Sequence, residues 1–245
     1  MNPINEKTLE HCETLSSAAK KKAVSQYLNI RYAEDRRPFT AYPLKLCSYL
    51  TNQYIQPYHY KNLLDLGCGR GDFLHAFAQC GLEVQGLDNT STDKNIFPET
   101  IISSEIEATT LPFKENTFDV VFSKSVIEHI HNTDVFLSEI YRILKPSGMC
   151  ILMTPDWKAQ FKHFYDDYTH VKPFTQMGLS DVIQAHGFTQ VEVKRFRQLP
   201  FVWKNPNLHW LCDLLSFFPE YFKKYTIVKF SKEWMLLSIA QKPQK

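Results

Sequence analysis

From residue 61 onward, short apolar runs alternate with amphipathic segments, and this alternation most restricts how the chain can fold. The apolar runs lie at 62–67, 83–88, 100–106, 118–123 and 149–155. Segments with apolar side chains at helical spacing lie between or after them, at 70–80, 133–144 and 175–187. Strands that alternate with helices form a parallel sheet that is covered on both faces. We therefore expect an α/β fold with a mostly parallel sheet.

The last two apolar runs break this alternation. Residues 188–196 and 234–241 have strand character, but no ordinary helical crossover lies between them. Two strands without such a crossover pair antiparallel, so we expect an antiparallel strand at one edge of the sheet. The segment between them, about 199–233, is predicted to be an insertion in a main domain that spans 61–245.

Residues 1–60 precede this pattern and are predicted to form an N-terminal helical extension. Residues 5–29 are helix-prone, and 42–55 carry leucine and isoleucine at helical spacing.

Composition and charge indicate which partners the chain can bind and in which cellular compartment it works. The chain has 44% hydrophobic and 22% charged residues and a net charge of +2, so no strong field favours DNA, and no DNA partner is expected. The first residues carry no secretory h-region, and no run of 18 apolar residues occurs. None of the six cysteines has C-x-x-C spacing, which indicates free thiols in a reducing compartment. We therefore expect a cytoplasmic protein.

A glycine-rich loop, LLDLGCGRGDFL, follows the first strand and carries Gly67, Gly69 and Gly71. Glycines between a strand and a helix let the backbone approach a ligand closely. A plain tight turn is the alternative, and the dinucleotide fingerprint places its third glycine one residue later. Asp88 ends the second strand, where a carboxylate accepts hydrogen bonds from ribose hydroxyls. The alternative role of Asp88, a helix N-cap, is compatible with this one.

Taken together, the stretches LDLGCGRGDFL, GLD, EATTLPFKENTFDVVFS and RILKPSGMCILMTP resemble class I S-adenosylmethionine-dependent methyltransferases, nearest to the type 11 group. The resemblance covers about residues 60–195. It implies a Rossmann-like sheet of seven strands. It also implies S-adenosylmethionine as the cofactor, S-adenosylhomocysteine as the product, and methyl transfer as the reaction.

The resemblance further implies where the cofactor lies. Its methionine and ribose portion would follow Asp65 and the glycine loop, Asp88 would hold the ribose, and Glu107, with Glu105 as the competing choice, would accept from adenine. Ser123 and Lys124 would line the amino-acid end. The expected cofactor-binding residues are Asp65, Gly67, Cys68, Gly69, Gly71, Asp88, Asn89, Glu107, Ala108, Ser123 and Lys124.

Methyl transfer is an in-line displacement, so positioning of the acceptor supplies much of the rate, and a hydroxyl acceptor also needs a base. The candidate catalytic residues are His129, His170 and Asp156, because each follows a strand at the edge where α/β proteins bind ligands. The alternatives are a histidine that packs a helix and acidic residues of a solvated loop.

The stretch V-I-E-H resembles the metal-binding segment of ubiquinone-pathway and small-RNA O-methyltransferases, in which a later histidine placed like His170 completes the site. Glu128, His129 and His170 would then be the ligands. The acidic residue expected three positions before Glu128 is Ser125, and a site that lacks one carboxylate binds a hard cation weakly. No resident metal is therefore expected.

The acceptor is predicted from a second resemblance. DYTHVKPFT is similar to methyltransferases of bacterial surface-polysaccharide biosynthesis, so we expect O-methylation of a sugar or lipid-linked saccharide. The aromatic residues of this loop suit either a lid over a small acceptor or a surface loop pinned by buried rings. The alternatives are a quinone-like small molecule or an RNA end with metal assistance, a non-catalytic cofactor-binding scaffold, and a nicotinamide-dependent oxidoreductase.

The insertion carries a basic amphipathic segment at 204–232. Such a segment suits peripheral contact with the inner face of a membrane. A cap packed on the sheet or a dimer contact is the alternative. The sequence leaves open the acceptor, the methylated atom and the oligomeric state.

Overall fold

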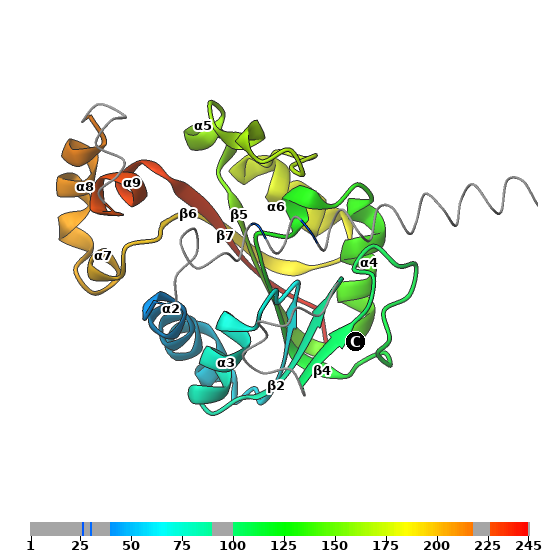
Figure 1. The fold of residues 1–245 in the computed structure, drawn as a ribbon. Coiled ribbons are helices and arrows are strands. Elements are labelled where there is room, and N and C mark those ends of the chain that lie inside the picture. Colours follow the sequence, from blue (N-terminus) through cyan, green and yellow to red (C-terminus); the bar gives the residue numbers. More distant parts are fainter. Residues whose placement is uncertain (1–25, 27–29, 31–39, 90–99, 218–225, 245) are drawn as a thin grey trace, which may run out of the picture.

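A computed structural model describes residues 26, 30, 40–89, 100–217 and 226–244. Its centre is a seven-stranded sheet in the order β3-β2-β1-β4-β5-β7-β6 (Figure 1). The strands are β1 (Asn62–Leu66), β2 (Glu83–Asp88), β3 (Ile101–Ser103), β4 (Phe118–Lys124), β5 (Leu144–Pro155), β6 (Thr189–Arg197) and β7 (Trp234–Gln241). The predicted α/β class and the seven strands are confirmed.

Strands β3, β2, β1, β4 and β5 pair in parallel, whereas β7 runs antiparallel to both of its neighbours. The predicted antiparallel pairing at this edge is therefore confirmed. The reversed strand β7 lies one position in from the edge, and β6 is the outermost strand. Because β7 pairs on both sides, its side chains are buried almost throughout.

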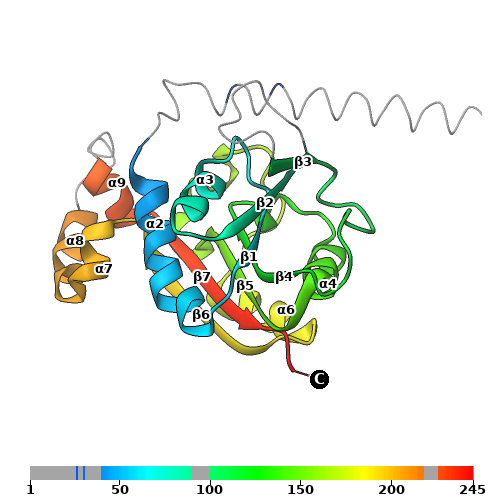
Figure 2. The ribbon, with the colours of Figure 1, turned by 90° about the horizontal axis from the view of Figure 1, so that it is seen from below.

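Helices cover both faces of the sheet (Figure 2). On one face lie α2 (Tyr42–Leu50) and α3 (Asp72–Gln79), and on the other lie α4 (Thr133–Ile143) and α6 (Gln176–Ala185). Successive residues of a strand point to opposite faces, so Leu63 joins the core under α2 and α3 while Leu64 joins the core under α4 and α6. Both side chains are fully buried.

The described part of the N-terminal extension packs in the same core as the sheet. Helix α2 continues through a π-helical turn (Thr51–Ile55) and a 3₁₀ turn (Gln56–Tyr58). Leu46, Leu50 and Ile55 are completely buried beside Leu63. The predicted helix at 42–55 is thus observed, whereas the helix-prone segment 5–29 lies almost entirely outside the described residues.

Strand β5 begins earlier than the sequence predicts. The sequence predicts a helix that ends at 144 and a strand that starts at 149, but pairing with β4 already begins at Leu144, so Pro146 and Gly148 lie inside the strand. The register of that pairing shifts between Phe118 and Val120, and an irregularity of this kind accommodates a proline inside a strand.

The segment between β5 and α6, predicted as a loop, contains two short helices. They are α5 (Trp157–Gln160) and η5 (Phe164–Asp166). The carboxylate of Asp156 accepts from the backbone N–H of Lys158 at 3.1 Å, so it caps α5.

The predicted insertion forms α7 (Pro200–Lys204), η6 (Pro206–Leu208), α8 (His209–Ser216) and α9 (Thr226–Lys232). These helices lie together beyond the ends of β6 and β7 (Figure 1) and share a small core of their own. Within the described residues, no helix combines the length and the apolar character that crossing a bilayer requires. The cysteines described are free thiols, as predicted.

Candidate active site

The glycine loop takes backbone conformations that few other residues adopt. Gly67, Gly69 and Gly71 all have positive φ, at 82°, 57° and 93°. The backbone N–H groups of Gly67 and Cys68 both donate to the carbonyl of Leu87, which folds the loop over the end of β2. A Cβ on Gly67 would lie 2.2 Å from a methyl carbon of Val126, so close packing also restricts that position to glycine.

Asp88 connects the end of β2 to this loop. Its Oδ2 accepts from the backbone N–H of Gly69 at 2.8 Å, and the residue is buried. The neighbouring Asn89 accepts from the backbone N–H of Ile106 at 2.7 Å, which ties the end of β2 to the segment after β3. The loop and both carboxyl ends thus form one connected edge of the sheet.

Asp65 is a completely buried carboxyl group in β1, just before the loop. Its Oδ2 has no hydrogen-bond partner among the described residues. Burial, reinforced by the nearby charges of Asp88 and Asp72, raises the pKa of Asp65 to about 8. A buried acid with one unsatisfied oxygen next to a ligand loop suits a cationic ligand, because a positive charge there would offset the cost of ionising the carboxyl group.

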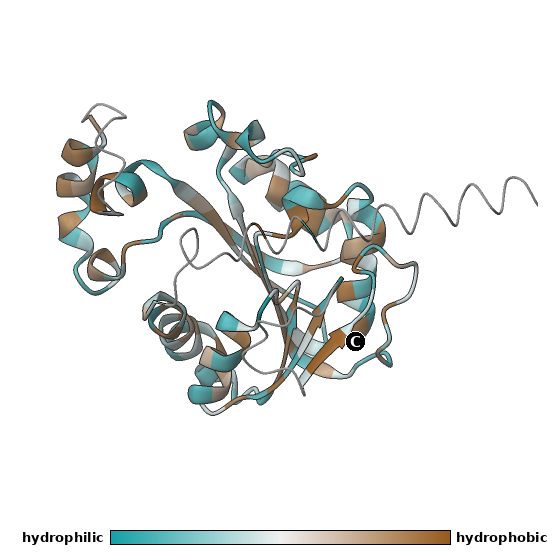
Figure 3. Cartoon of the chain, in the orientation of Figure 1, coloured by the Kyte–Doolittle hydropathy of each residue, from teal (hydrophilic) through white to brown (hydrophobic). Residues whose placement is uncertain are grey.

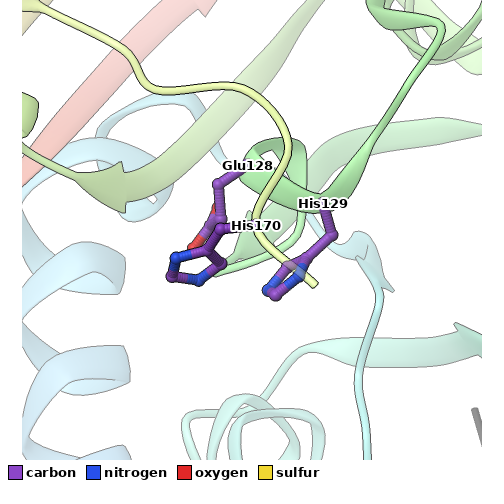
Figure 4. A group of neighbouring side chains, drawn as sticks. All are labelled: Glu128, His129 and His170. Atoms are coloured by element: carbon purple, nitrogen blue, oxygen red, sulfur yellow. The ribbon is translucent and has the colours of Figure 1, made fainter. Parts of the chain in front are cut away.

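A second group of side chains lies after β4. Glu128 and His129 belong to η4 (Ile127–His129), and His170 follows η5. The chain brings His170 there because the backbone N–H groups of Val171 and Lys172 donate to the carbonyl of Glu128. Ligating atoms of Glu128, His129 and His170 lie within 4.8 Å of one another, and the three side chains face one another in Figure 4. The structure thus brings together two of the three predicted catalytic residues.

Hydrogen bonds orient both imidazole rings. Thr169 Oγ1 donates to Asp167 at 2.7 Å, so it accepts from His129 Nδ1 at 2.9 Å. His170 Nδ1 donates to the carbonyl of Phe164. Each neutral ring therefore carries its proton on Nδ1 and its lone pair on Nε2, the arrangement of a base or a metal ligand.

Glu128 is buried, and burial raises its pKa to about 7 despite the hydrogen bond that it accepts from Thr154 Oγ1 at 2.9 Å. The sequence drew attention to Glu128 but not to Thr154 or Thr169. Nothing in their local pattern marks these threonines, since each bonds to a side chain that is distant in the sequence.

Comparison with known proteins shows which family this edge belongs to. Residues 64–152 match the family described as "Methyltransferase domain", of type 11, and this segment contains the glycine loop, Asp88 and Glu128. The chain carries a class I S-adenosylmethionine-dependent methyltransferase domain. The predicted family and cofactor are confirmed, and the unsatisfied Asp65 beside the loop fits a cofactor that carries an ammonium and a sulfonium group.

Relatives of the methyltransferase domain include two enzymes of quinone biosynthesis. A demethylmenaquinone methyltransferase of Lactiplantibacillus plantarum is 28% identical over 55% of this chain and 73% of its own. A ubiquinone biosynthesis O-methyltransferase of Bartonella tribocorum is 27% identical over 43% of this chain and 46% of its own. The chain therefore spans about half the length of the second relative.

A solved structure of another methyltransferase has a similar fold. The 1,6-didemethyltoxoflavin-N1-methyltransferase of Burkholderia thailandensis, with its substrate and S-adenosylhomocysteine bound, superposes with a TM-score of 0.61 at 16% identity and covers 94% of this chain and 90% of its own.

Several predicted cofactor residues of the methyltransferase domain already have partners. Glu107 Oε1 accepts from the backbone N–H groups of His131 and Asn132, at the start of α4. Ser123 Oγ donates to the carbonyl of Leu66 at 2.7 Å, which joins β4 to β1. Lys124 Nζ lies 5.5 Å from the ring centre of Phe73. The contacts of these residues with the cofactor stay predictions, as do those of Ala108, Asp65, Asp88, Asn89 and the glycine loop.

Asp156, the third predicted catalytic residue, interacts with other partners than the two histidines do. Besides capping α5, its carboxylate pairs with Arg195 Nε at 2.6 Å. A carboxylate with both oxygens engaged in this way suits a structural role at the end of β5, and its catalytic role stays a prediction.

Proposed function

We propose that the chain transfers the methyl group of S-adenosylmethionine to a hydroxyl oxygen of a small acceptor that binds against Glu128, His129 and His170. The grouping of these side chains beside the cofactor edge carries the proposal. The cofactor supplies an electrophilic methyl group on a sulfonium. The chain's own contribution is to hold the acceptor oxygen in line and to remove its proton.

Nε2 of His129 or His170 would accept the acceptor's proton as the new O–CH₃ bond forms and the S–CH₃ bond breaks. Nδ1 of His129 is hydrogen-bonded to Thr169, and Nδ1 of His170 to the carbonyl of Phe164. These hydrogen bonds hold the two rings, so that the Nε2 lone pairs keep their direction during this step. The buried carboxyl of Glu128, when ionised, would stabilise the imidazolium that results.

A quinone-like acceptor is supported by both named relatives, and methylation of an aromatic hydroxyl is supported by the second of them, which is an O-methyltransferase of ubiquinone biosynthesis. The loop after β5 supports an aromatic acceptor as well. Phe164 is buried against the ring of His170, and Tyr165, which meets the Phe164 ring edge-on, is largely exposed. A saccharide, predicted from the sequence, is the second candidate, since aromatic rings also stack on sugars.

The experiment is methyl transfer from a radiolabelled donor to a panel of catechols, quinols and saccharides. We expect activity with the catechols and quinols. His129→Ala or His170→Ala should lower kcat about 100-fold or more and leave the affinity for S-adenosylhomocysteine unchanged. His163→Ala is the matched control, because His163 lies in the same loop but pairs with Asp166. Cofactor binding without turnover on any acceptor would support a non-catalytic scaffold instead.

The same three side chains also support a metal-assisted version of this reaction. Two imidazoles and a carboxylate form a donor set for a divalent ion, and Asp167 Oδ2 lies 3.9 Å from His170 Nε2, so a second carboxylate is present although residue 125 is serine. A cation there would hold the acceptor oxygen and lower the pKa of its hydroxyl. Titration calorimetry with Mg²⁺, Mn²⁺ and Zn²⁺ tests this version. If a histidine alone acts as the base, none of these ions needs to bind, and a chelator leaves the activity unchanged.

A further inference from the structure

The α8–α9 region carries apolar side chains that face solvent. Trp210, Leu214 and Phe217 are 62%, 55% and 84% exposed, and Ile227 of α9 is 51% exposed. The first three are spaced by four and three residues, so they lie on one side of the helix. Figure 3 shows apolar residues on α8, away from the sheet. Large exposed apolar side chains gathered in this way mark interaction sites.

The opposite sides of these helices are already packed. Cys212 and Val202 are completely buried, and Val228 of α9 is also buried. Phe230 and Leu208 pack against the same small core. The sequence left open whether this amphipathic segment caps the sheet. Its inner residues do form a core, and the exposed residues are a second, outward face.

Charge indicates what covers this face. The segment 199–233 contains five lysines and three acidic residues. Among the described residues of this segment, Lys204 and Lys229 are exposed. The acidic Asp213 is also exposed, but it pairs with the buried Arg197. A matching surface must therefore be apolar and negatively charged.

We propose that the α8–α9 region docks on the interface of an anionic lipid bilayer through its exposed apolar residues Trp210, Leu214, Phe217 and Ile227, assisted by the exposed Lys204 and Lys229 of the same group of helices. Tryptophan and phenylalanine enter the headgroup region, and lysines attract anionic lipids. A second copy of the chain is a poorer partner, because two such faces would bring like-charged lysines together. The inference goes beyond the methyl-transfer reaction and holds for any acceptor.

The test is sedimentation of the full chain with vesicles of phosphatidylcholine alone or with 30% phosphatidylglycerol. We expect binding to the anionic vesicles that weakens with salt. The double variant Trp210→Ser/Phe217→Ser should lose at least about tenfold in partitioning, and Lys204→Glu/Lys229→Glu should remove the preference for anionic lipid. Met177→Ser is the matched control, because Met177 is equally exposed but lies on α6.

Binding of S-adenosylhomocysteine and the thermal midpoint must be unchanged in every variant, so that lost partitioning reports the surface rather than the fold. Equal partitioning of the wild-type chain and the Trp210→Ser/Phe217→Ser variant overturns the proposal. So does a wild-type dimer, detected by light scattering, that dissociates in this variant while vesicle binding is absent. Because cofactor binding and methyl transfer are measured separately, failure here leaves the proposed reaction standing.

Discussion

Thr154 Oγ1 donates to Glu128 Oε2 at 2.9 Å, and this bond joins the end of strand β5 to the helix η4 that follows β4. Both groups are buried, so the carboxyl group has little alternative solvation. The bond therefore sets the direction of Glu128 toward the two histidines.

Replacing Thr154 by valine keeps the shape of the side chain and removes the donor. We expect kcat to fall about tenfold or more, because a hydrogen bond to a buried carboxylate contributes about 1.5–3 kcal/mol. The affinity for S-adenosylhomocysteine should not change, and Thr154→Ser should restore most of the activity. If Thr154→Val lowers both kcat and the affinity for the cofactor, the hydrogen bond stabilises the structure of the whole sheet edge and has no specific role in the reaction.

Asp88→Ala should weaken S-adenosylhomocysteine binding by about 1–3 kcal/mol, measured by calorimetry. The change removes both the acceptor for Gly69 N–H and the predicted ribose contact. Asp181→Asn, on the exposed side of α6, should bind the cofactor normally. An unchanged dissociation constant in Asp88→Ala would place the ribose elsewhere.

The raised pKa of Asp65 predicts a pH dependence of stability. Its pKa is about 8 in the folded chain and near 3.8 when unfolded, so the folded state binds more protons between these values. The contribution of Asp65 to stability is therefore present below about pH 4 and decreases as the pH rises toward 8. Thermal unfolding should show Asp65→Asn becoming progressively more stable than wild type from pH 5 to pH 8.

The same residue predicts proton release on cofactor binding. An ammonium beside Asp65 favours its ionised form, so affinity for S-adenosylhomocysteine should rise between pH 6 and 8 more steeply in wild type than in Asp65→Asn. Calorimetry in buffers of different ionisation enthalpy measures the released proton directly. Parallel profiles for the two proteins would contradict this contact.

Gly67→Ala should destabilise the chain strongly. The φ of 82° costs about 1–2 kcal/mol for a residue with a Cβ, and the overlap with Val126 adds about 1–3 kcal/mol. Gly187→Ala is the matched control: φ is 84°, but the nearest atom lies 3.5 Å away, so only the backbone term applies. Val126→Ala should rescue part of the loss at Gly67 and none at Gly187, as judged by denaturant unfolding.

Local patterns in the sequence determined most of the sheet and the cofactor edge. The predicted strands at 83–88 and 234–241 match β2 and β7 at both ends, because strand periodicity and the residues that end a strand are properties of neighbouring positions. The positions of Gly67 and Asp88 at one edge of the sheet could be predicted for a similar reason. Each follows directly from its place at the end of a strand, and the ends of parallel strands meet at one edge.

Tertiary structure alone decided what lies between distant loops. His129 and His170 are 41 positions apart, and they meet because backbone groups of Val171 and Lys172 bond to the carbonyl of Glu128. Asp156 was predicted to be catalytic from its place after β5, but its pairing with Arg195 depends on β6 lying outside β7. No periodicity along the chain encodes these pairs, since they depend on how separate segments pack in space.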